Sequence, residues 1–198
     1  MNMIRYTTKE MQQGYNYGKG WASDMMQYCA SSVEKYMFSK LYDTIFAMYL
    51  YKSQEEDKIV REKITTCHYS GRLLMKKLEV KEQYMALSEE EEKQGKIGYD
   101  SAVECINKIE RTCYPNEKLN NIIQMYSEMR TAAIDCSKGK YELTTMDDQM
   151  SVFIFIMIKC NLKNPVTELN FLFDYLNYKE DRNDMEQLLI TNMQVNIL

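Results

Sequence analysis

The sequence predicts an all-α protein, and three observations support this prediction. The 198 residues include only 7 Gly and 2 Pro, whereas a β-sandwich or β-barrel needs many turn-forming residues. The 16 Met residues, together with abundant Leu, Glu, Lys and Gln, favour helices. Apolar residues also recur at three- and four-residue spacing along much of the chain, which places them on one face of each helix.

Composition and charge disfavour several classes of protein. Aromatic residues make up 12% of the chain, which is enough apolar surface for a core and argues against disorder. The net charge of −4 disfavours a nucleic-acid-binding protein, because such proteins normally carry a basic face. The longest apolar run, residues 152–158, is far shorter than the roughly 20 residues that span a bilayer. The first residues of the chain contain no apolar signal-peptide core.

The reactive side chains indicate neither a metal site nor a common catalytic site. The six cysteines are widely separated, and the chain has one histidine, so we expect reduced thiols in the cytoplasm and no zinc site. A Ser/His/Asp site would need His68 as its base, but the chain has no Gly-x-Ser-x-Gly motif and no phosphate-binding glycine loop. We therefore expect no metal, no cofactor and no covalent chemistry.

The residue pattern divides the chain into four segments. Polar and glycine residues at the start predict a flexible arm, and helical periodicity follows it. The sequence SEEEEKQGKIG then combines mutually repelling glutamates with two glycines, and it predicts a solvated acidic linker. The alternative for the run from Glu89 to Glu92 is an acidic docking surface. The segments are residues 1–22 (arm), 23–87 (helical), 88–98 (linker) and 99–198 (helical).

Two helices of the last segment are expected to begin at a proline. Pro115 and Pro165 suit the first helical position, where the missing N–H group would have no partner in any case. Glu117 lies in the first turn of the first helix, where a negative charge interacts favourably with the helix dipole. Asn164 directly precedes Pro165 and is the expected N-cap of the second helix.

An acidic pair, Asp147 and Asp148, precedes the apolar run 152–158. Periodicity alone does not separate a buried strand from a buried helix here; the two acids and the continuation to Cys160 favour the helix. On local grounds a carboxylate at this place caps the helix. The functional alternative is a carboxylate presented to a partner at the mouth of a groove. A metal site would need more oxygen ligands than the sequence supplies.

Three stretches of the second half together resemble a known family. They read YDSAVECINKIERTCYPNEKLNNI, TTMDDQMSVFIFIMIKCNLKNPVTELNFLFDYL and QLLITNM. The first contains a Pro-x-Glu-Lys pattern at Pro115, Glu117 and Lys118, the second contains the acidic pair, and the third contains Thr191 and Asn192. In this order and spacing they resemble the vacuolar-protein-sorting-nine (Vps nine) domain of Rab guanine-nucleotide exchange factors, and they look closest to its alsin branch.

The resemblance extends upstream of these stretches. The sequence VEKYMFSKLYDTIF at residues 33–46 resembles the helix that begins the bundle beside such a domain, so the resemblance covers roughly residues 30–198. It implies a layered helical Vps-nine-type domain over residues 99–198 and an N-terminal helical bundle over residues 23–87. Family domains continue for some residues beyond the position of Leu198, so we expect either a fragment or a member with a trimmed end.

The resemblance implies a guanine-nucleotide exchange factor domain that releases GDP from a Rab-five-class small GTPase in endosomal traffic. In such domains a carboxylate reaches the nucleotide site, engages the phosphate-binding lysine and disturbs the magnesium ion of the GTPase. A negative group that replaces phosphate contacts stabilises the empty GTPase and thereby weakens GDP binding. Asp148 is the matching, catalytic aspartate. Asp147 is better suited to cap the helix, although the two roles could be exchanged.

The resemblance also implies a groove that accepts the switch regions of the GTPase. Thr191 and Asn192 would position its far side. Core packing is the alternative for Val152, Phe155 and Leu188. The expected GTPase-binding residues are Asp147, Val152, Phe155, Leu188, Leu189, Thr191 and Asn192.

Three positions depart from the family pattern. Many members carry a tyrosine that contributes strongly to exchange two residues before the threonine, where this chain has Leu189. Ser151 replaces a common proline, and Tyr114 replaces a Thr or Ser that would cap the helix. The alternative function is therefore a non-catalytic helical scaffold that binds a small GTPase or another subunit, and an unrelated helical bundle is a third. We expect a cytoplasmic protein with indirect membrane contact, recruited to endosomes through partners or further segments.

Overall fold

The computed structural model describes residues 19–67, 69–85, 88–96, 98–179 and 184–197. Within these ranges every regular element is a helix, which confirms the all-α prediction. His68 and most of the expected N-terminal arm lie outside the described residues. The elements are α2 (Lys19–Thr66), α3 (Gly71–Lys77), η1 (Glu82–Tyr84), α4 (Glu89–Lys93), α5 (Asp100–Asn107), η2 (Ile109–Arg111), α6 (Pro115–Cys136), α7 (Met146–Lys159), α8 (Pro165–Tyr178) and α9 (Asp184–Ile197).

The chain divides into two compact units, Met1–Met48 and Tyr49–Leu198. The described part of the first unit is the N-terminal portion of α2, which begins at Lys19, inside the segment predicted as an arm. Residues 23–87, which the sequence predicts as a helical bundle, contain α2, α3 and η1; their arrangement as a bundle remains a prediction.

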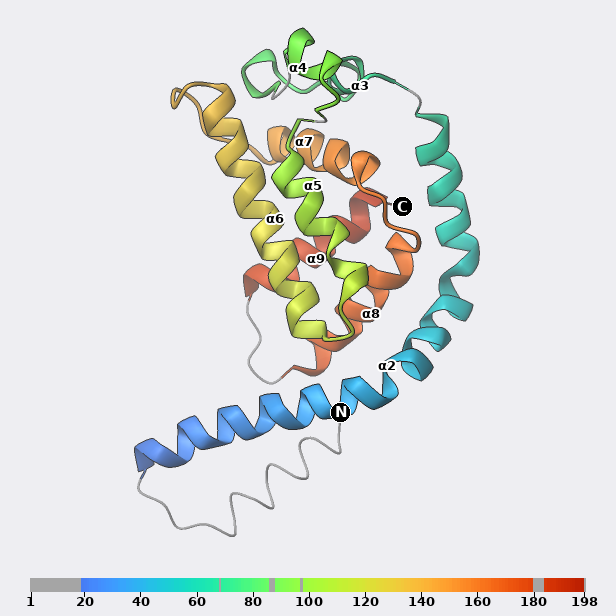
Figure 1. Ribbon diagram of the computed structural model, residues 1–198, viewed down its shortest axis with the longest axis vertical. Helices are drawn as coiled ribbons and strands as arrows, with labels where there is room; N and C mark the ends of the chain where they lie inside the picture. The colour runs from blue at the N-terminus through green and yellow to red at the C-terminus, as the bar shows by residue number, and fades with distance from the viewer. Residues whose placement is uncertain (1–18, 68, 86–87, 97, 180–183, 198) are drawn as a thin grey trace. The chain divides into compact units, whose positions relative to one another are not determined.

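The core of the second unit lies among α5 to α9. In Figure 1, α5 and α6 run side by side and antiparallel, α9 lies behind them, and α7 crosses near the C-terminal end of α6. Fully buried apolar side chains from four of these helices meet between them; examples are Ile106, Ile122, Phe155 and Leu172. The apolar run at residues 152–158 is part of α7, so the choice of a buried helix over a strand is confirmed.

The helix starts at Pro115 and Pro165 are confirmed, but the residue that caps the second of these helices differs from expectation. Asn164 does not cap α8, because its side-chain oxygen accepts a hydrogen bond from Arg61 instead. Asp57 of α2 takes over: its carboxylate accepts from the backbone N–H groups of Val166 at 2.8 Å and Thr167 at 3.3 Å. Because Asp57 is almost completely buried, a distant helix provides the N-terminal cap of α8.

Replacing Asp57 by alanine is expected to lower the free energy of unfolding by about 2–3 kcal/mol, because buried N–H donors of α8 lose their acceptor. Urea unfolding followed by circular dichroism measures this loss. The neighbouring Glu56 is exposed on the same helix, so Glu56→Ala is the matched control and is expected to stay within about 0.5 kcal/mol of the wild type. Equal effects of the two substitutions would contradict the capping role of Asp57.

The acidic stretch at residues 88–98 contains a short helix where the sequence predicts a solvated loop. Ser88 and Glu91 form a reciprocal capping box at the start of α4: the Ser88 hydroxyl accepts from the Glu91 N–H, and the Glu91 carboxylate accepts from the Ser88 N–H. Backbone and side-chain hydrogen bonds from Ser88, with a further one from Lys96, lower the pKa of Glu91 to about 2. The Ser-x-x-Glu spacing was the local signal for this helix. Glu89 and Glu90 are exposed, whereas Glu91 and Glu92 are partly covered.

Candidate functional site

The N-terminus of α7 is capped by Thr145, not by either acid of the pair. The Thr145 hydroxyl accepts a hydrogen bond from the Asp148 N–H at 3.3 Å. The prediction that Asp147 caps this helix is therefore wrong, because Thr145 already occupies the position before the first helical residue. Asp147 and Asp148 instead lie in the first turn, where their negative charge interacts favourably with the helix dipole. Both carboxylates remain available for other contacts.

The two acids have different surroundings. Asp147 is exposed, whereas Asp148 is only 8% exposed. The Asp148 carboxylate oxygen Oδ2 lies 2.9 Å from the Nζ atom of Lys81, which precedes η1. The Lys81 side chain is itself 57% exposed. Asp148 is therefore a largely covered carboxylate, and Lys81 reaches it from the solvent side.

These contacts keep Asp148 ionised at neutral pH. Burial raises the pKa of Asp148, but hydrogen bonds from Lys81 and with Thr145 outweigh this effect and hold the pKa below its usual range. The same hydrogen bond raises the pKa of Lys81. Because the folded-state pKa of Asp148 is depressed, its contribution to stability is present above the pKa of the unfolded chain. That contribution is lost as the pH falls through the folded-state value.

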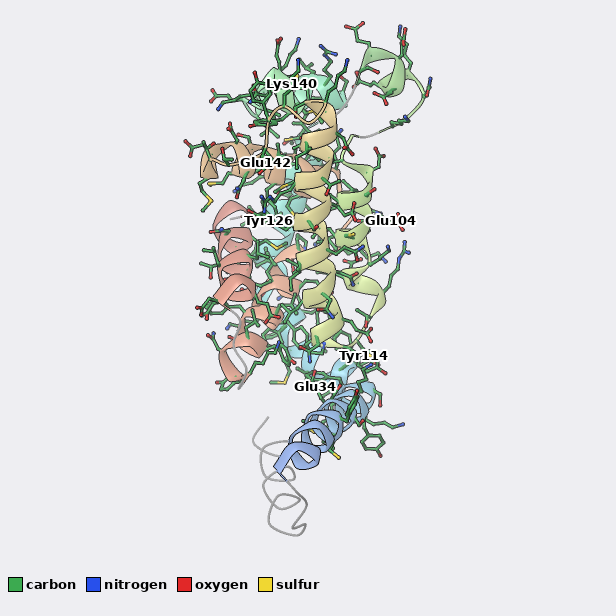
Figure 2. All side chains as sticks on the ribbon, turned by 90° about the vertical axis from the view of Figure 1, so that its left-hand side faces the viewer. Glu34, Glu104, Tyr114, Tyr126, Lys140 and Glu142 are labelled. Carbon is green, nitrogen blue, oxygen red and sulfur yellow. The ribbon has the colours of Figure 1, made fainter. Side chains whose placement is uncertain are left out.

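A mostly apolar groove lies beside this turn, between α6, α7 and α9. Tyr126 and Leu189 line it and also line a second hollow of about 320 Å³ along α6, so the two depressions adjoin. Figure 2 shows Tyr126 on the side of α6 that faces away from Glu104 of α5. We call this depression the α6–α7–α9 groove; its lining residues are Met125, Tyr126, Met146, Gln149, Met150, Phe153, Leu189, Asn192 and Met193.

Hydrogen bonds fix the wall between α6 and α7. The Tyr126 hydroxyl donates to the Gln149 side-chain oxygen, and the Gln149 amide group donates to the Leu143 carbonyl at 2.8 Å. Four of the nine lining residues are methionines, whose flexible, polarisable side chains adapt to varied surfaces. The groove thus combines an adaptable apolar floor with a rigid polar wall, an arrangement suited to contact with a protein surface.

The structure brings some of the predicted residues to this groove and leaves others away from it. Leu189 and Asn192 line the groove. Thr191 is exposed, and its hydroxyl donates to the Gln187 carbonyl one turn earlier. Val152 and Phe155 have no exposed surface, so they pack in the core, as the alternative interpretation of them states, and offer no surface to a partner in this conformation.

Leu188 and Leu189, which precede Thr191, have opposite environments. Leu188 is 50% exposed, whereas Leu189 is 6% exposed and lines the groove wall. Asp148 does not line the groove. Its neighbours Met146 and Gln149 do, but at about 100° per residue Asp148 lies on the other side of α7, where its carboxylate contacts Lys81.

Sequence reasoning missed two contributors to this site. Lys81 lies 67 positions before Asp148 in a charged stretch with no distinguishing pattern. Tyr126 fits the apolar stripe of α6, and nothing in the sequence separates it from a core residue. Among the residues that the structure describes, no group of three or more His, Cys, Asp or Glu side chains is placed to hold a metal ion. No helix in the described ranges is long and apolar enough to cross a membrane.

Comparison with known proteins places this geometry in context. A family model described as the Vacuolar sorting protein 9 (VPS9) domain matches residues 99–197. Alsin of Homo sapiens and Alsin of Pan troglodytes are each 30% identical to the chain over 78 residues, and Alsin of Rattus norvegicus is 28% identical over 78 residues. Each match covers 39% of this chain and only 5% of the length of the relative. The family match contains α5 to α9 and the groove, whereas Lys81 precedes it.

Proposed function

The chain belongs to the Vacuolar sorting protein 9 (VPS9) domain family, and from this premise we propose that it is a guanine-nucleotide exchange factor domain for a Rab-five-class small GTPase. Membership of the family implies exchange activity on Rab GTPases. The choice of the Rab-five class and a role in endosomal traffic are our proposal, supported by the likeness to Alsin over part of the chain. The observation that carries it is the ionised Asp148 in the first turn of α7, the helix whose other side lines the α6–α7–α9 groove.

The proposed mechanism needs two features to act together. The switch regions of the GTPase dock on the groove, where Met146 and Met150 of α7 lie opposite Leu189 and Asn192 of α9. Docking brings the first turn of α7 to the nucleotide site, and Asp148 engages the phosphate-binding lysine there. Because a carboxylate that takes the place of a phosphate stabilises the nucleotide-free GTPase, GDP binding weakens by the same coupling free energy.

The remaining predicted residues have secondary roles in this proposal. Asp147, Leu188 and Thr191 are exposed on α7 and α9, two of the helices that line the groove, so they can contact the docked GTPase outside the groove itself. Val152 and Phe155 act indirectly, by packing α7 against the core. We propose that the domain acts in the cytoplasm and reaches endosomes through its GTPase or other partners.

The test is the release of fluorescent GDP from a purified Rab-five-class GTPase, which the chain is expected to accelerate. Met146→Asp is expected to lower kcat/KM about fivefold to tenfold, because a charge at the 50% exposed rim of the groove opposes apolar docking. An acid in the first turn of α7 favours the helix, so this variant stays folded. Leu73→Asp, at a similarly exposed leucine of α3 outside the groove, is the matched control and is expected to retain full activity.

The competing function is a scaffold that binds the GTPase without exchange. It would be established if the folded chain bound nucleotide-free GTPase but left GDP release unchanged. If the chain neither binds any member of a panel of Rab GTPases nor accelerates GDP release from one, both proposals are overturned. If the chain accelerates GDP release only from a Rab GTPase of another class, the exchange function stands and the Rab-five assignment is wrong.

A further inference from the structure

We propose that Lys81 is a displaceable counter-ion of Asp148, which holds the carboxylate in the free chain and gives way to the cationic group of the GTPase during exchange. This inference rests on the proposed function, because it takes Asp148 as the carboxylate that engages the GTPase. It assigns a part in the exchange step to the segment that precedes the matched domain at residues 99–197.

The backbone around Lys81 is anchored while its side chain is free to move. Val80 and Tyr84, on either side, are buried. The Tyr84 hydroxyl donates to the Glu142 carbonyl at 2.8 Å, which ties η1 to the segment leading into α7. The Tyr99 hydroxyl donates to the Tyr84 carbonyl at 2.6 Å. The backbone of Lys81 is thus held beside Asp148. Its side chain is exposed, so it can move into water without leaving a cavity.

The local charge favours replacement of one cation by another. The Lys81 ammonium group pairs with Asp148, and Asp147 in the same turn adds a further, weaker effect that raises the pKa of Lys81. The site therefore keeps a net negative charge even while the ion pair is formed, and it attracts an approaching cation. A lysine–carboxylate pair whose lysine lies in solvent contributes little net stability, so its disruption opposes docking only weakly.

This role predicts a gain of activity when Lys81 loses its charge. Lys81→Met retains the apolar stem and removes the competing ammonium group, so kcat/KM for GDP release is expected to rise about twofold to fivefold, the range that the strength of an exposed pair allows. Salt weakens the pair, so the ratio of variant to wild-type rate is expected to fall towards one as ionic strength rises. Lys81→Arg restores the ion pair and is expected to exchange no faster than the wild type.

Lys76→Met is the matched control, because it removes the same charge from an exposed lysine of α3. It is expected to leave kcat/KM within about 1.5-fold of the wild type, since surface charge substitutions away from a site have small effects. If Lys76→Met raises the rate as much as Lys81→Met, the gain reflects net charge and the inference is overturned. An unchanged or lower rate in Lys81→Met also overturns it, and a lower rate would identify Lys81 as a positioning residue.

An NMR titration of the free chain tests the ion pair without the GTPase. Lys81→Met is expected to raise the pKa of Asp148, because desolvation then acts with less opposition, whereas Lys76→Met is not. An unchanged Asp148 titration in Lys81→Met rejects the pair. If the titration shifts but neither the wild type nor Lys81→Met accelerates GDP release, the proposed function has failed and the displacement step with it, while the ion pair stands.

Discussion

Replacing Asp148 by alanine is expected to lower kcat/KM for GDP release by on the order of 100-fold, the size of effect seen when a preorganised electrostatic contact is removed from a reacting site. The first turn of α7, capped by Thr145, sets the backbone position of Asp148, so the carboxylate is placed before the GTPase arrives. Its loss removes the negative group that stabilises the nucleotide-free GTPase. Stopped-flow release of fluorescent GDP measures the effect.

The same substitution is expected to leave the fold intact. Thr145 still caps α7, and the Lys81 side chain, already 57% exposed, becomes solvated. Because the Lys81 half of the pair lies in solvent, the pair contributes little net stability, so urea unfolding of Asp148→Ala is expected to differ little from that of the wild type. Asp148→Asn retains the shape of the side chain without its charge; a loss close to that of Asp148→Ala identifies the charge as the active property.

Asp147→Ala separates the two acids of the pair. Asp147 is exposed and lies in the same turn, so its replacement is expected to lower kcat/KM less than about fivefold, through weaker electrostatic attraction of the GTPase. If Asp147→Ala abolishes exchange and Asp148→Ala does not, the two roles are reversed. If neither substitution changes the rate of an active chain, the carboxylate mechanism is wrong for this protein.

Features with a local signature were predictable from the sequence. The starts of α6 and α8 follow from Pro115 and Pro165, because the properties of proline act on its own helix turn. The helical state of residues 152–158 followed from the acids before them and from the length of the run. The signal for α4 is also local: the Ser88–Glu91 capping box stabilises the start of this helix despite the repulsion between its glutamates.

Features that depend on distant segments were not predictable from the sequence. Asp57 caps α8 across a separation of 109 residues, and Lys81 reaches Asp148 across 67; a charged residue on a helix carries no sign of its eventual partner. Leu188 and Leu189 are chemically identical neighbours, yet only Leu189 is buried, because the rotation of α9 against α6 and α7 decides which one faces the groove.

The ion pair of Lys118 and Glu168 is expected to have the largest effect on stability. Lys118 is fully buried, and its ammonium group donates to both Glu168 carboxylate oxygens, at 3.0 and 2.8 Å, and to the Ile109 carbonyl at 2.7 Å. These bonds join α6, α8 and η2 at the base of the helices that carry the groove. Lys118→Met is expected to lower the free energy of unfolding by about 3–5 kcal/mol, because it leaves a buried carboxylate without its partner.

The double variant Lys118→Met/Glu168→Leu separates the cost of an unpaired charge from the value of the pair. Replacing a buried ion pair by apolar side chains of similar volume is often neutral or stabilising by about 1–4 kcal/mol. We therefore expect the double variant to recover most of the stability lost in Lys118→Met. Urea unfolding of the wild type, both single variants and the double variant completes the thermodynamic cycle.

The pH dependence of Lys118→Met provides an independent check. Burial raises the pKa of Glu168 to about 7 even with the lysine in place, and loss of the ammonium group raises it further. A carboxyl group with a raised folded-state pKa binds protons more readily in the folded chain, so its destabilising effect grows as the pH rises towards that value. The loss of unfolding free energy in Lys118→Met is therefore expected to shrink as the pH falls from about 9 to about 7; below that value Glu168 is protonated in the folded wild type as well, and the two chains change alike. A deficit that is constant over this range would show that lost packing, not an unpaired charge, is its cause.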